Sequence, residues 1–302
     1  MYARILVPLD GSKTAEKVLP FARFLARRLK LPVELLEVID VAEIGRRIPP
    51  DKAQYVSTAL ENVARNSAQY LNKIAGTFPE ALVSCTVDKG TAAEVIVDKA
   101  AAEKNSLINM ATHGHSGISR WLLGSVAEKV LRAATNPLLL IRATEEAKTE
   151  GEAILRCAIV PLDGSELAES VLPTVAELAK SLQLEVVLFR AYILPHSALA
   201  VDPEGFYLAS DEELIATMRD EMVAYLDKKA QAMKKSGIER VSTIAEYGFA
   251  ADEIISLARK TPDNLIAMCT HGRSGVKRWV LGSVTETVVR HSGDPVLVIR
   301  ST

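Results

Sequence analysis

The 302-residue chain has little cysteine, few aromatic residues and almost no net charge. Its three cysteines are widely spaced and form no CxxC pair, so the sequence predicts neither a disulfide framework nor a structural zinc site. A formal net charge of −2 leaves no domain-wide basic excess to neutralise nucleic-acid phosphates. No apolar run approaches the roughly 20 residues that a membrane-spanning helix needs. The N-terminus shows no signal-peptide pattern, and we therefore expect a cytoplasmic protein.

Signatures of catalysis are also missing. The chain has no G-x-S-x-G nucleophile elbow, no G-x4-G-K-[ST] phosphate loop and no His/Asp/Glu cluster with metal-ligand spacing. We therefore identify no catalytic residue and no protein metal site. Magnesium is expected only as a companion of nucleotide phosphates, because it commonly binds through few protein ligands.

What the sequence does contain is an internal repeat. "VPLDGSKTAEKVLP" at Val7 returns as "VPLDGSELAESVLP" at Val160, and eleven of the sixteen positions from Ala111 to Val126 are identical in Cys269 to Val284. A length of 302 residues also predicts two domains of about 150 residues each. The polar segment Arg142 to Arg156 is the best linker candidate. We expect domains at residues 1–145 and 156–302, joined by a linker at 146–155.

Within each half, short apolar runs alternate with longer amphipathic stretches, which is typical of βαβ units and a parallel sheet. We expect an α/β fold of two doubly wound domains, each with a five-stranded parallel sheet of order 3-2-1-4-5. The expected strands of the first half are Arg4 to Pro8, Val33 to Ile39, Leu82 to Val87, Ser106 to Met110 and Leu138 to Ile141. Those of the second half are Ala158 to Pro161, Glu185 to Ala191, Val241 to Ala245, Asn264 to Met268 and Val296 to Ile299.

Two repeated features fall at strand ends, where open parallel sheets bind ligands. The first is the "PLDGS" turn after strand one, and the second is the glycine-rich string after strand four. Glycines in the string allow a positive φ and a close approach to a ligand, while Gly-Ser at the start of the next helix offers free amides to an anion. Ordinary turn and cap chemistry is the alternative interpretation. The near identity of the two strings in otherwise diverged halves favours a phosphate site.

"VPLDGS", "THGHSG" and "LLGSVAEKVLRAATNPLLLIR" resemble the universal stress protein domain of the ATP-binding type, whose pattern is G-x2-G-x9-G-[ST]. The resemblance covers both halves, so the chain resembles a tandem universal stress protein. It implies that ATP, or ADP or AMP, binds between the turn and the string. The implied nucleotide-binding residues are Leu9, Asp10, Val38, Ala111, Gly114, Gly117, Gly124 and Ser125 in the first half, and Leu162, Asp163, Ala191, Cys269, Gly272, Gly275, Gly282 and Ser283 in the second.

One departure from that pattern matters: the first glycine is Ala111 in one half and Cys269 in the other. The larger thiomethyl group of Cys269 puts the second site in more doubt. A redox thiol is one interpretation of Cys269, and a small buried apolar residue is the favoured one.

The resemblance also implies partners. Domains of this family typically pair through the last strand, here "PLLLIR" and "PVLVIR", so we expect the two halves to form a pseudo-dimer within the chain. A further homodimer and an unidentified protein partner are also expected. Three hypotheses for function remain: a nucleotide-binding stress-response regulator, a slow ATPase using Asp10 and His113, and an interaction module that has lost its nucleotide.

Overall fold

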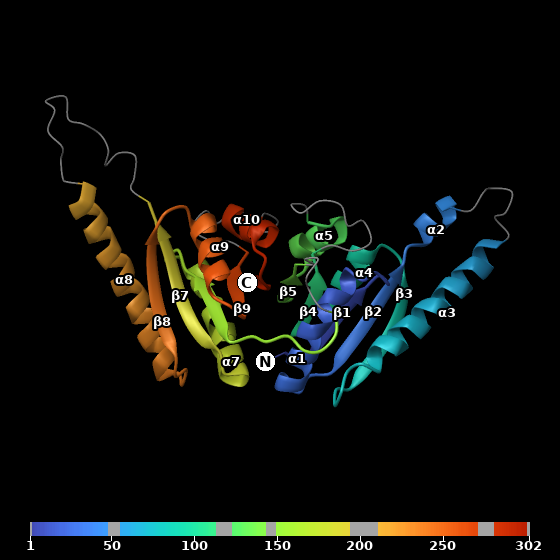
Figure 1. Ribbon diagram of the computed structural model, residues 1–302. Coiled ribbons are helices and arrows are strands. Elements are labelled where there is room, and N and C mark those ends of the chain that lie inside the picture. Colours follow the sequence, from blue (N-terminus) through green and yellow to red (C-terminus); the bar gives the residue numbers. More distant parts are fainter. Residues whose placement is uncertain are drawn as a thin grey trace, which may run out of the picture. The chain divides into compact units, whose positions relative to one another are not determined.

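The computed structural model describes residues 2–47, 55–112, 123–142, 149–193, 211–270 and 281–300. These residues form two compact units (Figure 1). The first unit contains the described residues up to Ile154 together with Pro295–Arg300, and the second contains those from Leu155 to Asp294. Each unit is an α/β structure with a mostly parallel sheet, as the sequence pattern predicts.

The first unit has the strand order β3-β2-β1-β4-β5-β10. Its first five strands are parallel, in the predicted order 3-2-1-4-5, and β10 lies antiparallel to β5. The strands are β1 Arg4–Leu9, β2 Val33–Ile39, β3 Val83–Lys89, β4 Ser106–Ala111, β5 Leu138–Ile141 and β10 Val296–Ile299. The helices are the 3-10 turn η1 Ala15–Val18, α1 Leu19–Leu29, α2 Val41–Arg47, α3 Val56–Ala75, α4 Ala92–Ala102 and α5 Ser125–Ala133.

The second unit repeats this plan with parallel strands in the order β9-β6-β7-β8. Its strands are β6 Cys157–Pro161, β7 Glu185–Tyr192, β8 Val241–Tyr247 and β9 Asn264–Cys269. Its helices are α6 Glu166–Glu169, α7 Leu172–Leu182, α8 Asp211–Lys235, α9 Ala250–Lys260 and α10 Ser283–His291. The fifth predicted strand of the second half is β10, which packs with the first unit.

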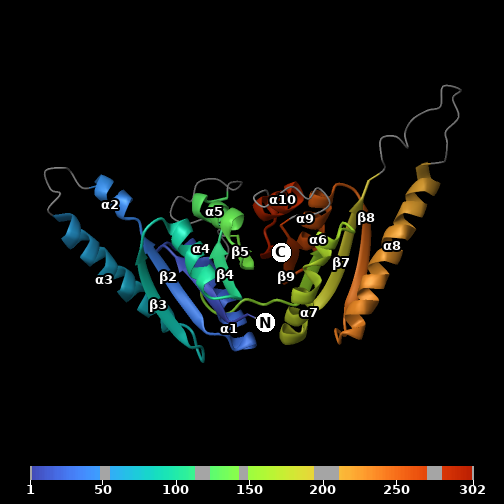
Figure 2. The same cartoon turned by 180° about the vertical axis from the view of Figure 1, so that it is seen from behind.

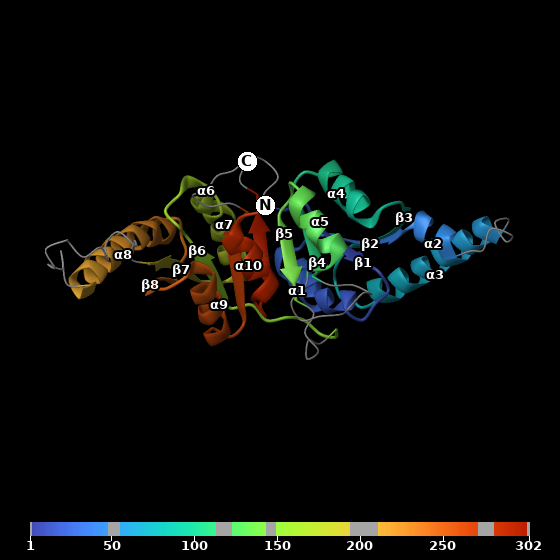
Figure 3. The ribbon, with the colours of Figure 1, turned by 90° about the horizontal axis from the view of Figure 1, so that it is seen from above.

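Apolar sequence explains why the central strands lie where they do. All six residues of β4 and all six of β9 are buried, as expected for strands covered on both faces. Figure 3 shows α4 and α5 side by side on one face of the first sheet, with α1 and α3 on the other, and α9 and α10 take the places of α4 and α5 in the second unit. Figure 2 shows α3 running beside β3 and α8 beside β8. This layering leaves the carboxyl ends of the strands as the natural place for a ligand.

Most predicted elements match those of the structure to within one or two residues at each end. The helix α2 was not predicted, because its seven residues are too few for a periodic pattern to stand out.

The linker region packs on the first unit. Arg23 is 7% exposed, and its Nη1 donates to the carbonyl oxygens of Thr149 and Gly151 at 3.0 and 2.9 Å. The backbone amide of Ala153 donates to the carbonyl of Pro20 at 3.0 Å. Residues 149–153 are therefore held against α1.

Candidate functional site

The Asp-Gly-Ser turn has the same geometry in both halves. In the first half, the amide and hydroxyl of Ser12 donate to Asp10 Oδ1 at 3.0 and 2.6 Å. In the second, the amide and hydroxyl of Ser165 donate to Asp163 Oδ1 at 2.9 and 2.6 Å. Each turn presents a carboxylate at the end of the first strand and fixes its orientation through one of its two oxygens.

The glycine in each turn has a positive φ, +77° at Gly11 and +87° at Gly164. L-residues with a side chain rarely adopt this conformation, so the turn needs glycine at this position. The serine that follows then supports the next helix, since Ser12 Oγ accepts from the amide of Ala15 at 3.0 Å and Ser165 Oγ from that of Ala168 at 3.1 Å. These glycines and serines were not among the predicted site residues, although Asp-Gly-Ser is a recognisable turn sequence.

A helix N-terminus lies beside the end of the fourth strand in each half. The amide of Gly124 donates to the carbonyl of Thr112 at 2.8 Å, and the amide of Gly282 to that of Thr270 at 2.8 Å. Gly124 and Gly282 are the N-caps of α5 and α10, and no side chain in the described part of the chain caps either helix. The serines that follow, Ser125 and Ser283, are the first residues of these helices. The first amides of each helix therefore remain available to an anion.

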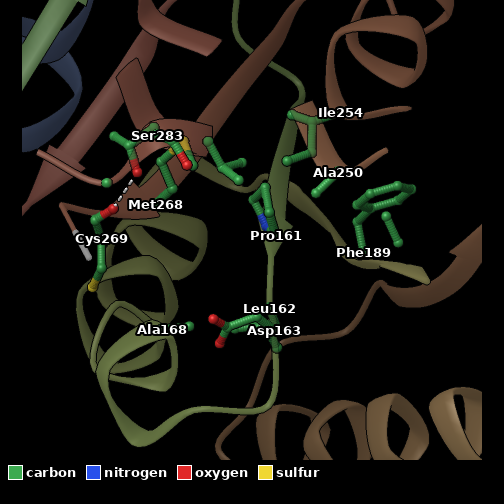
Figure 4. Close-up of a pocket in the computed structure, with 14 residues that line it drawn as sticks. Pro161, Leu162, Asp163, Ala168, Phe189, Ala250, Ile254, Met268, Cys269 and Ser283 are labelled. Carbon is green, nitrogen blue, oxygen red and sulfur yellow. Dashed lines mark hydrogen bonds between the residues drawn. The ribbon is translucent and has the colours of Figure 1, made fainter. Parts of the chain in front are cut away.

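In the second unit these features enclose a cavity of about 270 Å³. Its polar boundary is Asp163 on one side and Ser283 at the start of α10 on the other (Figure 4). The other lining residues are mainly apolar: Pro161, Leu162, Ala168, Phe189, Ala191, Ala250, Ile254, Met268, Cys269, Gly282, Val284 and Thr285. The structure thus brings together the predicted residues Leu162, Asp163, Ala191, Cys269, Gly282 and Ser283.

Cys269 turns its sulfur toward α6. Its Sγ lies 3.0 Å from Ser170 Oγ, and its carbonyl accepts from Thr285 Oγ1 at 2.8 Å. Burial raises the pKa of the Cys269 thiol, which disfavours the reactive thiolate. The structure thus favours the interpretation of Cys269 as a small buried residue over that of a redox centre.

In the first unit the predicted residues occupy matching places. Leu9 ends β1, pairs in register with Glu37 and is followed by Asp10, while Val38 is the next residue of β2. Ala111 ends β4, and Gly124 and Ser125 begin α5. The turn, the two strand ends and the helix start therefore recur at this sheet edge.

Several predicted residues lie outside the described ranges. They are Gly114, Gly117, Gly272 and Gly275 of the glycine-rich strings, together with His113.

A group of polar side chains beside the second turn was not predicted. Glu169 of α6 accepts from Tyr225 Oη at 2.8 Å and pairs with Lys229 Nζ at 2.5 Å, both from α8. The guanidinium of Arg190 lies 4.8 Å from the centre of the Tyr225 ring. Burial tends to raise the pKa of Glu169, but hydrogen bonds from Lys229 and Tyr225 outweigh it and the pKa is lowered. These residues come from elements far apart in the sequence, so no motif could reveal them.

Two features are absent from the described part of the chain. None of its helices is long and apolar enough to cross a membrane. Nor do its His, Cys, Asp and Glu side chains gather in a group that could hold a metal ion.

Comparisons with known proteins agree with this architecture. The model of the universal stress protein family matches twice, at residues 1–142 and 156–300. A universal stress protein of Mycolicibacterium smegmatis is 22% identical over 98% of this chain and 96% of its own length. Universal stress protein MJ0531 of Methanocaldococcus jannaschii is 30% identical over 50% of this chain and 85% of its own length. The crystal structure of a universal stress protein from Archaeoglobus fulgidus has the same fold, with a TM-score of 0.66 at 20% identity over 99% of this chain and 97% of that chain.

The two matches of the family model cover almost the whole chain, and each falls on one copy of the strand order, the Asp-Gly-Ser turn and the glycine-started helix. The chain therefore belongs to the universal stress protein family and carries two of its domains in tandem.

Proposed function

We propose that this protein is a cytoplasmic stress-response regulator that binds ATP or another adenine nucleotide. The observation that carries the proposal is the cavity of the second unit, which has a carboxylate at one side and an uncapped helix N-terminus at the other. A nucleotide has complementary parts: hydroxyl groups that donate to a carboxylate, phosphates that accept from amides, and an apolar base.

The cavity offers a place for each of these parts. Asp163 accepts hydrogen bonds from ribose hydroxyls, and its Oδ1 is already oriented by Ser165. The amides of Ser283, Val284 and Thr285 at the start of α10 face the phosphates. Apolar side chains such as Phe189, Ile254 and Met268 surround the base. At about 270 Å³ the cavity is close to the size of a small-ligand pocket, and the phosphates extend from it toward α10.

We propose a regulator rather than an efficient enzyme. Hydrolysis of ATP needs a group that orients and deprotonates water, and the sequence singles out no residue for this role beyond Asp10 and His113. Weak hydrolysis of ATP is the alternative. It is tested by comparing ATP turnover of the wild-type protein with that of the double variant Asp10→Ala, Asp163→Ala, prepared in the same way. Turnover that survives both changes does not come from these sites.

We also propose that the two halves pair as a pseudo-dimer and that the protein assembles further into a homodimer. The antiparallel pairing of β10 with β5, in the register Leu297 to Leu139, supports a role for the last strands in this pairing.

Mass spectrometry of small molecules released from the denatured protein, followed by equilibrium binding of labelled ATP, tests the proposed function. We expect a purine nucleotide in the released fraction and saturable ATP binding to the purified chain. The double variant Asp10→Ala, Asp163→Ala should bind ATP about tenfold more weakly, because each site loses its charged acceptor for ribose hydroxyls. Undiminished binding in the double variant would contradict the proposed site.

A further inference from the structure

One sheet position beside the Asp-Gly-Ser turn differs in charge between the two halves. In the first half Glu37 of β2 pairs in register with Leu9, the residue before Asp10. In the second half Phe189 of β7 pairs with Pro161, so Arg190 occupies the corresponding place beside Leu162, the residue before Asp163. A carboxylate in one half is thus replaced by a guanidinium in the other.

Arg190 is fixed directly behind the second turn. It is 8% exposed, and its guanidinium packs on the ring of Tyr225. A Cβ built on Gly164 would lie 2.9 Å from Arg190 Nη1 and 3.1 Å from Nη2, so the guanidinium touches the backbone of the turn that carries Asp163. Lys229 adds a second cation nearby through its pair with Glu169. One cation therefore lies against the turn that carries Asp163, and another pairs with Glu169.

The first half surrounds the equivalent tyrosine with carboxylates. Burial raises the pKa of Tyr70, and Glu16, Glu37 and Asp10 raise it further. Burial and Glu169 likewise raise the pKa of Tyr225 in the second half, but Arg190 there acts in the opposite direction. Lys13 pairs with Glu16 at 2.7 Å, yet its side chain is 84% exposed and its charge is largely screened by water. The pKa of both tyrosines is raised, and only the contribution from this sheet position changes direction, upward from Glu37 and downward from Arg190.

The strand that lines the cavity also differs between the halves. Phe189 of β7 lines the cavity of the second unit and pairs in register with Pro161. At the matching place in the first half, Pro8 pairs with Leu36 of β2. The ring of Phe189 can stack on a planar base, which the side chain of Leu36 cannot do.

We propose that the second half holds the tight nucleotide site. The charge at this one sheet position, positive at Arg190 and negative at Glu37, makes the nucleotide affinity of the second half higher than that of the first. The inference rests on the proposed function. A nucleotide carries several negative charges, and a buried cation behind the turn lowers the repulsion between these charges and Asp163. Glu37 adds to the repulsion around Asp10 instead. The chain then binds one nucleotide tightly, in the half whose glycine pattern begins with Cys269.

The test compares ATP with adenosine, which has the same base and ribose but no charge. Calorimetric titrations of the wild-type chain, Arg190→Gln, Arg190→Lys and Glu37→Lys give affinity and the number of ligands bound per chain. We expect one tight ATP site in the wild type, a loss of about tenfold in ATP affinity in Arg190→Gln, and recovery of most of this loss in Arg190→Lys. Adenosine affinity should change less than about twofold in all three variants, because the effect acts on charge.

Glu37→Lys extends the test to the first half and does not depend on the folding of an Arg190 variant. Reversing the charge there should raise the number of ATP molecules bound toward two. Equal losses of ATP and adenosine affinity in Arg190→Gln, two equal sites in the wild type, or an unchanged stoichiometry in Glu37→Lys would each overturn the inference while leaving the proposed function standing. A wild-type chain that binds neither ligand would overturn both.

Discussion

At the level of single residues, the two Asp-Gly-Ser turns differ in what lies behind the glycine. Around Gly11 a Cβ would meet no atom within 4 Å, whereas around Gly164 it would meet the guanidinium of Arg190. The sequence is the same in both turns, so the repeat alone predicts equal turns. One position that distinguishes them is contributed by the neighbouring strand, as Glu37 of β2 or Arg190 of β7. A sequence pattern cannot show this difference because it arises from pairing between strands.

We predict that Gly164→Ala destabilises the protein more than Gly11→Ala. Both changes place alanine at a positive φ, which costs about 1–2 kcal/mol. Gly164→Ala also forces Arg190 to move. Urea denaturation of the two variants measures the free energy of unfolding, and equal losses would show that Arg190 does not support the turn.

The thiol of Cys157 makes the free energy of unfolding depend on pH in the alkaline range. It is 5% exposed in β6, and burial, followed by Glu185, raises the pKa of its thiol from the ordinary value of 9.0 to about 11. The folded protein therefore holds this proton more tightly than the unfolded chain does. The resulting stability is fully present below pH 9 and is lost as pH rises through about 11.

In Cys157→Ala we predict that the fall in the free energy of unfolding between pH 9 and pH 11 becomes smaller, by on the order of 2 kcal/mol. The slope with pH is the readout, because the smaller side chain also lowers stability at every pH. Parallel pH profiles for variant and wild type would contradict the assignment.

At the level of elements, periodicity predicted nearly all strands and long helices, because buried strands and amphipathic helices leave strong patterns. It did not predict α2. It also could not show that residues 149–153, polar enough to suggest a plain linker, are held by Arg23 of α1. A buried guanidinium makes these contacts with backbone carbonyl groups. Every residue has such a group, so the sequence does not reveal which ones the guanidinium binds.

The Arg23 contact predicts resistance of this segment to proteolysis. In Arg23→Met, the carbonyls of Thr149 and Gly151 lose their donor, and cleavage by a glutamate-specific protease at Glu150 or Glu152 should become at least about tenfold faster. Arg27→Met is the matched control, since Arg27 lies on the same helix, its side chain is 48% exposed, and it pairs with the side chain of Glu152. Equal cleavage rates in the two variants would show that Arg23 does not hold the segment.

At the level of the whole molecule, repeat detection predicted two similar domains, and the family comparison shows them. The domain limits at residues 145 and 156 remain a proposal. The repeat predicts two equivalent sites, whereas the charges at Glu37 and Arg190 lead us to propose one tight site. The thiol of Cys269, the residue that puts the second site in more doubt, lies against Ser170.

Strand β10 gives a prediction at this scale. It lies antiparallel to β5 and covers the edge of that strand. Removing the residues after Asp294 should leave a four-residue apolar edge unpaired, and such edges associate with other chains. Light scattering after size-exclusion chromatography should show larger assemblies for the truncated chain, and an unchanged mass would contradict this role of β10.

The central claim is that a nucleotide occupies the cavity at the carboxyl edge of the second sheet. Ala250 begins α9 and lines this cavity, and Ala92 begins the corresponding helix α4 of the first unit. The most direct measurement is calorimetric titration of ATP into Ala250→Trp and Ala92→Trp. We predict that Ala250→Trp abolishes tight ATP binding because the indole fills the cavity, while Ala92→Trp keeps it; tight binding that survives Ala250→Trp, or is lost only in Ala92→Trp, would contradict the account.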